Sequence, residues 1–205
     1  DPYLSDSVAK TEPQNKRRQP VAEEFFNVKP TTVVITHEHA DHYDEETLDK
    51  LLSCADGCVF FAPPSVFERA KRRYKNVNCV FFRSGTSFTA GGNVFRAVRA
   101  EHSDTEAVGV IISCEGKDLY ITGDTLYSES VFESLPENLN CYAVFLPING
   151  RGNNMNADDA ARFLKRVKHD FAVPMHFGLF DDLSGRELVC ENAVIPEIYK
   201  EITFR

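Results

Sequence analysis

Apolar and polar positions alternate along this sequence in blocks typical of a layered α/β protein. Eight short apolar runs are expected to form strands, and several of them are apolar on both faces, as in sheets that are covered on both sides. They span Val33–Thr36, Val59–Ala62, Val77–Phe82, Val94–Val98, Val108–Ser113, Leu119–Thr122, Tyr142–Leu146 and Phe171–Met175. No repeat, low-complexity tract or linker separates them, so residues 1–205 are expected to form a single domain.

Helical patterns lie between these runs. Asp44 precedes a segment whose leucines recur on one face, and Asn156 precedes a second segment of the same kind, so each residue is expected to cap a helix that packs on a sheet. Pro63-Pro64 opens a third helix, which carries the basic stretch RAKRRYK. Because the chain is acidic overall, this stretch is expected to face solvent and not nucleic acid.

Composition narrows the class of protein. A chain of 205 residues with 42% hydrophobic residues can build a core, and a net charge of −8 disfavours nucleic-acid and anionic membrane partners. No apolar stretch approaches the roughly 20 residues of a membrane span, and no signal pattern opens the sequence. The six cysteines include no Cys-x-x-Cys pair, which indicates reduced, mostly buried thiols and a cytoplasmic protein. A homo-oligomer is compatible with the sequence.

The stretch THEHADHYD concentrates polar groups that bind metals. His37, His39, Asp41 and His42 follow an apolar strand and precede the helix capped by Asp44, so they occupy a strand-to-helix loop. Imidazole and carboxylate ligands without sulfur suit zinc, manganese or iron in a reactive site more than a structural zinc site. Four such groups so close in sequence are more easily divided between two adjacent ions.

Further ligands of these types follow other apolar runs. His102, Asp124 and His176 each lie where an expected strand gives way to a loop, and residues in such positions can converge at one sheet edge. His169 lies in a polar turn before a strand and is expected to be a surface histidine.

The H-x-H-x-D-H cluster, followed in order by His102, Gly123-Asp124 and His176, resembles the metallo-β-lactamase superfamily. This resemblance implies a four-layer αββα sandwich with two divalent metal ions. It implies that one ion is held by His37, His39 and His102, the other by Asp41, His42 and His176, and that Asp124 bridges them. It also implies that Asp1 supports the histidine loop without being a ligand.

A closer resemblance extends over nearly the whole chain. The segments DPYLSDSVAKTE, TTVVITHEHADHYDEETL, GDTLYS, LPINGR and PMHFGLF are similar to the L-ascorbate-6-phosphate lactonase branch of that superfamily. Its members are cytoplasmic hydrolases that depend on Mn²⁺ or Zn²⁺. They carry β-strands before the Asp-Pro that opens this sequence, so the first strands of the fold are expected to be missing here.

The expected reaction is the opening of a lactone, or a similar ester of a small anionic molecule, by a metal-bound hydroxide. Asp41 or Asp124 would orient the water or shuttle a proton. Arg151 and Asn149, in the Gly-rich loop NGRGNN, are the candidate substrate-binding residues, and an arginine there could bind a phosphate or carboxylate. A second basic cluster, Lys16 to Arg18, could cover the substrate pocket, but its side chains are expected to be solvated.

Three other functions could use the same ligands. A metal-dependent phosphodiesterase or nuclease of the superfamily is the main alternative, although such enzymes usually carry a basic exosite or clamp that this acidic chain does not suggest. An oxygen-reducing diiron protein typically has a glutamate where His39 stands, together with a flavin domain. A non-catalytic binding module is disfavoured by the intact ligand set.

Overall fold

Two β-sheets form the centre of the fold in a computed structural model that describes residues 1–21 and 23–204. The smaller sheet contains three parallel strands, β1 (Thr32–Val34), β2 (Val59–Ala62) and β3 (Asn78–Phe81). The larger sheet has six strands in sequence order. They are β4 (Ser87–Ala90), β5 (Asn93–Arg99), β6 (Val108–Cys114), β7 (Lys117–Ile121), β8 (Cys141–Pro147) and β9 (His169–Met175).

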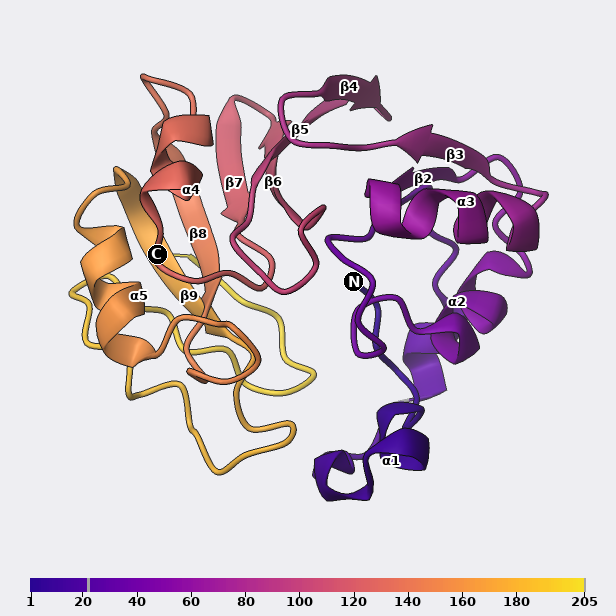
Figure 1. Ribbon diagram of the computed structural model, residues 1–205, viewed down its shortest axis with the longest axis horizontal. Coiled ribbons are helices and arrows are strands. Elements are labelled where there is room, and N and C mark those ends of the chain that lie inside the picture. The colour runs from indigo at the N-terminus through magenta and orange to yellow at the C-terminus, as the bar shows by residue number, and fades with distance from the viewer. Residues whose placement is uncertain (22, 205) are drawn as a thin grey trace.

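Helices cover the outer face of each sheet (Figure 1). Helices α2 (Glu45–Leu52) and α3 (Pro64–Arg73) lie on the flank of the smaller sheet, and α4 (Glu129–Ser134) and α5 (Ala157–Leu164) lie on the opposite flank. The N-terminal segment adds the short helices α1 (Val8–Thr11), η1 (Pro13–Asn15) and η2 (Glu23–Asn27). No helix among the described residues has the length and apolar character needed to cross a bilayer. The expected four-layer αββα sandwich is confirmed.

Three apolar clusters fill the three interfaces between these layers. In β2, Phe60 packs in the cluster that joins the smaller sheet to α2 and α3, whereas Phe61 packs between the two sheets. In β6, Val110 packs between the sheets, whereas Ile111 belongs to the cluster beneath α4 and α5. Successive side chains of a strand point to opposite faces, so this alternation explains why the strands are apolar on both faces.

Local polar contacts start the helices and keep the basic stretch at the surface. Asp44 accepts a hydrogen bond from the backbone N–H of Glu46, and Asn156 caps α5 by accepting one from Asp159. In α3, Arg73 forms a salt bridge with Asp49 of α2 at 2.6 Å. The basic side chains of this stretch are exposed to solvent, as expected.

Short elements account for most differences from expectation. The eight expected strands are all present, with ends shifted by at most two residues, but β4, α4 and the helices before β1 are additional. Each is too short to show a periodic pattern on its own.

The six cysteines are free, as expected, but the expectation that most of them are buried was wrong. Only Cys58 and Cys141 are fully buried, and Cys54 is exposed.

Strand directions bring distant loops to one edge of the larger sheet. Strands β5 and β7 both pair antiparallel with β6 and therefore run in the same direction, and β8 and β9 continue parallel to β7. The chain thus leaves β5, β7, β8 and β9 at the same edge. The loop after β1 reaches this edge, where the Thr36 carbonyl accepts a hydrogen bond from Val108 at 2.9 Å.

Candidate metal centre

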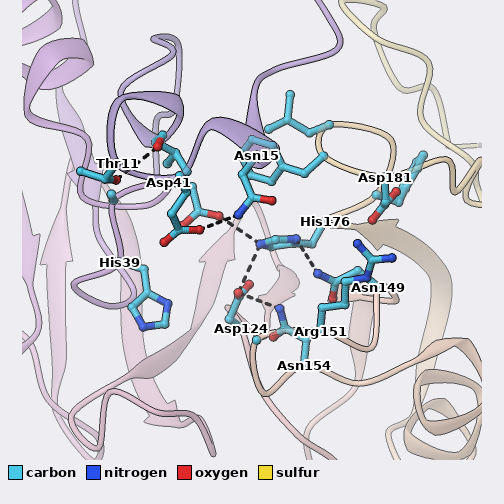
Figure 2. A pocket seen from close by; sticks show the side chains of 17 residues that line it. Thr11, Asn15, His39, Asp41, Asp124, Asn149, Arg151, Asn154, His176 and Asp181 are labelled. Carbon is cyan, nitrogen blue, oxygen red and sulfur yellow. Dashed lines mark hydrogen bonds and ion pairs between the residues drawn. The ribbon is translucent and has the colours of Figure 1, made fainter.

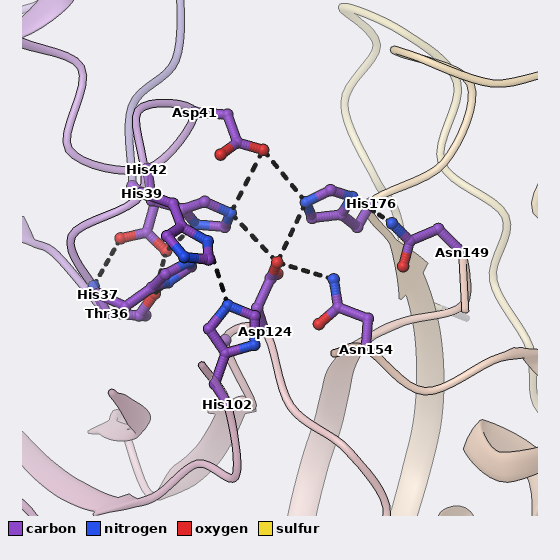
Figure 3. A network of polar contacts seen from close by, with 12 residues as sticks. Thr36, His37, His39, Asp41, His42, His102, Asp124, Asn149, Asn154 and His176 are labelled. Carbon is purple, nitrogen blue, oxygen red and sulfur yellow. Dashed lines mark hydrogen bonds and ion pairs between the residues drawn. The ribbon is translucent and has the colours of Figure 1, made fainter. Parts of the chain in front are cut away.

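The seven ligand-type side chains singled out by the sequence meet at this sheet edge (Figure 3). They form three overlapping groups in which the potential ligand atoms all lie within 4.8 Å of one another. These groups are His37, His39 and His102; His37, His42 and Asp124; and Asp41, His42 and His176. His169 lies apart from them, half-buried at the start of β9 with its Nδ1 2.7 Å from the Val167 carbonyl.

In the first group, three imidazole rings turn nitrogen atoms toward one another. His102 Nε2 lies 3.2 Å from His39 Nδ1, and the rings of both residues lie 4.6 Å from the ring of His37. His37 is completely buried, and its Nε2 has no hydrogen-bond partner among the described residues. A buried nitrogen without a partner costs about 1–3 kcal/mol. A cation bound by these nitrogens would remove that cost, so the residues present fit a metal ion.

The second half of the centre pairs carboxylates with imidazoles. His176 Nε2 lies 3.2 Å from Asp124 Oδ2 and 3.4 Å from Asp41 Oδ2. His42 Nε2 lies 3.5 Å from the same oxygen of Asp124. His176 directly follows β9 and has a φ of 54°, in the left-handed region that few non-glycine residues adopt. Asp124 therefore lies between the rings of His42 and His176, at the meeting point of these loops.

Burial and charge favour the cation-binding form of His37, Asp41 and Asp124, but not that of His176. Burial lowers the pKa of His37 to about 2, and the neighbouring His42 adds to this shift, so the His37 ring is neutral. Burial by itself would raise the pKa of Asp124 and Asp41. Hydrogen bonds and charges of His176 and His42 outweigh burial, lowering the pKa of Asp41 to about 2 and holding that of Asp124 well below its usual range. Both carboxylates are therefore ionised at neutral pH. At His176 burial lowers the pKa, but hydrogen bonds with Asp124 and Asp41 and the charges of these carboxylates outweigh burial and raise the pKa to about 10, so this ring must lose a proton when it binds a cation.

Asp1 supports the histidine loop from behind, in the position that the resemblance implied. Its Oδ1 accepts a hydrogen bond from the Thr36 backbone N–H at 2.6 Å, and its Oδ2 lies 3.0 Å from His42 Nδ1. The Thr36 hydroxyl donates to Asp1 at 2.7 Å and lies 2.9 Å from His37 Nδ1. Asp1 thus orients the His42 ring directly, through Nδ1, and the His37 ring indirectly, through the Thr36 hydroxyl.

Two further polar residues were not singled out from the sequence. The buried Asp104 accepts hydrogen bonds from the Glu38 backbone N–H at 3.0 Å and the Ser65 hydroxyl at 2.6 Å, which ties the histidine loop to α3. Asn154 donates to Asp124 at 2.7 Å. Their signals were weak: Asp104 stands two residues after His102, and Asn154 closes the Asn-rich loop NGRGNN.

A cavity of about 350 Å³ opens beside the centre (Figure 2). Its walls include ligand-type residues, part of α1 and η1, and the loop after β9. Both expected substrate-binding residues line it, because the loop after β8 lies beside His176. Arg151 is exposed, and its guanidinium makes no hydrogen bond or ion pair with any described residue. Asn149 has its side-chain amide 3.0 Å from His176 Nδ1.

In the second basic cluster, Lys16 to Arg18, the two arginines hold neighbouring segments of the chain together. Arg17 donates to the Tyr3 carbonyl at 2.7 Å, and Arg18 forms an ion pair with Asp182. The backbone N–H of Arg18 also donates to the Leu179 carbonyl at 3.1 Å. These contacts fasten the N-terminal segment to the loop after β9, and the cluster is not part of the cavity lining.

Comparison with known proteins agrees with this fold. A UPF0173 metal-dependent hydrolase of Thermoplasma acidophilum is 26% identical over an alignment of 220 residues. The alignment covers 98% of this chain and 88% of the relative. The structure of Igni18, a metallo hydrolase from Ignicoccus hospitalis, is similar with a TM-score of 0.61 and 26% identity, over 74% of this chain and 66% of that one.

The metallo-beta-lactamase fold protein YhfI from Bacillus subtilis has a TM-score of 0.66 at 17% identity, over 85% of this chain and 79% of that one. Its likeness concerns the fold alone. The family model described as "Beta-lactamase superfamily domain" matches residues 1–177, which include all seven ligand-type residues. The chain therefore belongs to the beta-lactamase superfamily domain family.

Proposed function

We propose that this protein is a metal-dependent hydrolase that holds two divalent ions, Mn²⁺ or Zn²⁺. His37, His39 and His102 would hold one ion, Asp41, His42 and His176 the other, and Asp124 would bridge them. The observation that carries the proposal is the buried His37 Nε2, which lacks a partner among the described residues, in a group whose ligand atoms lie within 4.8 Å of one another. The name of the Thermoplasma acidophilum relative, a metal-dependent hydrolase, supports it.

Bound divalent ions would act as Lewis acids that polarise a substrate oxygen and lower the pKa of water to about 7. The two carboxylates would then have different tasks. The Asp124 side chain is only 7% exposed, and its Oδ2 already contacts Asn154, His42 and His176. Both carboxylates line the cavity, but Asp41 is 21% exposed, so it is the better placed of the two to pass a proton to a leaving alcohol.

The proposed substrate is a lactone, or a similar ester, of a small molecule with one anionic group, such as a phosphorylated sugar lactone. A cavity of about 350 Å³ suits a small substrate. Arg151 offers an unpaired guanidinium for a phosphate or carboxylate, whereas Glu12 and Asp181 in the same lining would repel further anionic groups. The resemblance of the chain to the lactonase branch supports the lactone class.

The test is a substrate panel on protein stripped with a chelator and reloaded with Mn²⁺ or Zn²⁺. A phosphorylated sugar lactone, an uncharged lactone of the same ring and bis(p-nitrophenyl) phosphate would be compared. We expect metal-dependent hydrolysis with the charged lactone preferred. Efficient cleavage of the phosphodiester with no lactone turnover would replace the proposal by the phosphodiesterase alternative, and activity that persists without metal would refute both.

A further inference from the structure

Asn149 lies at the edge of the candidate metal centre, beside the ring of His176 (Figure 2). It follows β8, and its Nδ2 lies 3.0 Å from His176 Nδ1. The other side-chain atom, Oδ1, is buried and has no hydrogen-bond partner among the described residues. The amide thus turns its nitrogen to the ring and leaves its oxygen without a partner.

The other histidines of the centre follow a different rule. In each of them, the ring nitrogen that faces away from the neighbouring ligands lies 2.9–3.2 Å from an oxygen atom. These oxygens are Thr36 Oγ1 for His37, Ser103 Oγ for His39, Asp1 Oδ2 for His42 and the Asn153 carbonyl for His102. An oxygen in this position accepts the N–H of the ring and leaves the opposite nitrogen with a free lone pair.

His176 needs the same arrangement if its Nε2 is to bind a cation. Nε2 is the atom that faces Asp41 and Asp124, so the ring proton must then lie on Nδ1. A protonated Nδ1 opposite an amide NH₂ would place two donors against each other. Exchanging the oxygen and nitrogen of the Asn149 amide removes this conflict, and the two orientations have almost the same shape.

We propose that Asn149 is a positioning residue for the second metal ion: its Oδ1 accepts the Nδ1–H of His176 and so fixes the tautomer and direction of that ligand. The inference rests on the proposed function, because it presumes an ion on His176. It assigns Asn149 to the support of a ligand, in place of the direct contact with substrate expected from the sequence. Arg151 then remains as the substrate-binding residue of this loop.

Two substitutions separate these roles. Asn149→Asp keeps an acceptor oxygen and removes the amide donor, whereas Asn149→Leu removes both at similar volume. Asn156→Asp is the matched control, because it adds the same charge in the same loop and can still cap α5. Affinity for Zn²⁺ would be measured by competition with a chromogenic chelator. Long-range ¹H–¹⁵N spectra of the zinc-loaded proteins would report the tautomer of His176.

We expect Asn149→Leu to bind the more weakly held Zn²⁺ about 10–100-fold less tightly than wild type. Asn149→Asp and Asn156→Asp should stay within about threefold of wild type or bind more tightly, and wild type should show a proton on His176 Nδ1. Unchanged affinity in Asn149→Leu, or an equal loss in Asn149→Asp, would overturn the inference while leaving the metal centre in place. A wild-type protein that takes up no Zn²⁺ would overturn the proposed function as well.

Discussion

Asn154 donates a side-chain N–H to Oδ2 of Asp124 across 2.7 Å, in a buried contact between loops 30 residues apart in sequence. Because Asp124 is the proposed bridge, Asn154→Ala should weaken metal binding by about 10–100-fold without unfolding the protein. Asn154→Asp would place a second carboxylate against that of Asp124. Because the two charges repel each other, this variant should lower the Tm of the metal-free protein further than Asn154→Ala does. Chelator competition and thermal melts would measure these effects, and wild-type metal affinity in both variants would contradict them.

Metal content tests the number of ions and the bridging position. Wild-type protein reconstituted with Mn²⁺ or Zn²⁺ should contain about two ions per chain by elemental analysis. Asp124→Ala should lose hydrolysis and at least one ion, because this carboxylate belongs to both halves of the centre. Asp1→Ala should only weaken binding, by about 10–100-fold, because Asp1 supports His42 and Thr36 and is not itself a proposed ligand. Equal, small losses in both variants would refute the assignment, and the exposed Asp158→Ala serves as control.

Arg151 should discriminate between charged and uncharged substrates. Arg151→Ala removes a charge-assisted contact worth about 1.5–3 kcal/mol, which corresponds to a loss of about 10–100-fold in kcat/KM for a phosphorylated lactone. An uncharged lactone with the same ring should react at nearly the wild-type rate, and metal content should be unchanged. Arg186→Ala, an exposed arginine outside the cavity, should affect neither substrate. An equal loss on both lactones would mean that Arg151 shapes the loop and does not bind the anion.

Gly123 should be required for the approach of Asp124 to the centre. Its φ is +62°, and an added Cβ would lie 2.9 Å from the Val108 carbonyl oxygen and 3.1 Å from Thr36 Cβ. The left-handed conformation alone costs a non-glycine residue about 1–2 kcal/mol. Gly91 has a similar φ of +56° with no atom near its added Cβ, so Gly91→Ala should show only that conformational cost. Denaturant unfolding should therefore find Gly123→Ala the less stable variant, and equal losses would exclude the steric contact.

Buried cysteine thiols should react more slowly than exposed ones. Burial raises the pKa of the Cys141 thiol to about 12 and also raises the pKa of Cys58 and Cys79, whereas Cys54 is exposed. The thiolate is the reactive form, so Cys54 should react first with Ellman's reagent in the native protein, and all six thiols should react after denaturation. Cys54→Ser should remove the fast phase and Cys141→Ser should leave it unchanged. A fast phase that survives in Cys54→Ser would contradict this order.

The sequence by itself determined the layered architecture and the chemical character of the centre. Strands such as β6 carry apolar residues on both faces, and this pattern requires a layer on each side whatever the order of strands. His37, His39, Asp41 and His42 lie within six residues of one another, so no distant contact is needed to bring these ligands into one loop. The positions of His102, Asp124 and His176 directly after strands were also legible from the sequence.

Only the tertiary structure decided which atoms meet and what supports them. The contacts of Asp104 with Glu38 and of Asn154 with Asp124 join residues 66 and 30 positions apart, and they exist because strand order and direction bring those loops to the same edge. The same holds for Arg18, which pairs with Asp182 across 164 residues and does not line the cavity. Residue spacing records which groups can be neighbours along one element, whereas convergence between elements depends on how the sheets pair and pack.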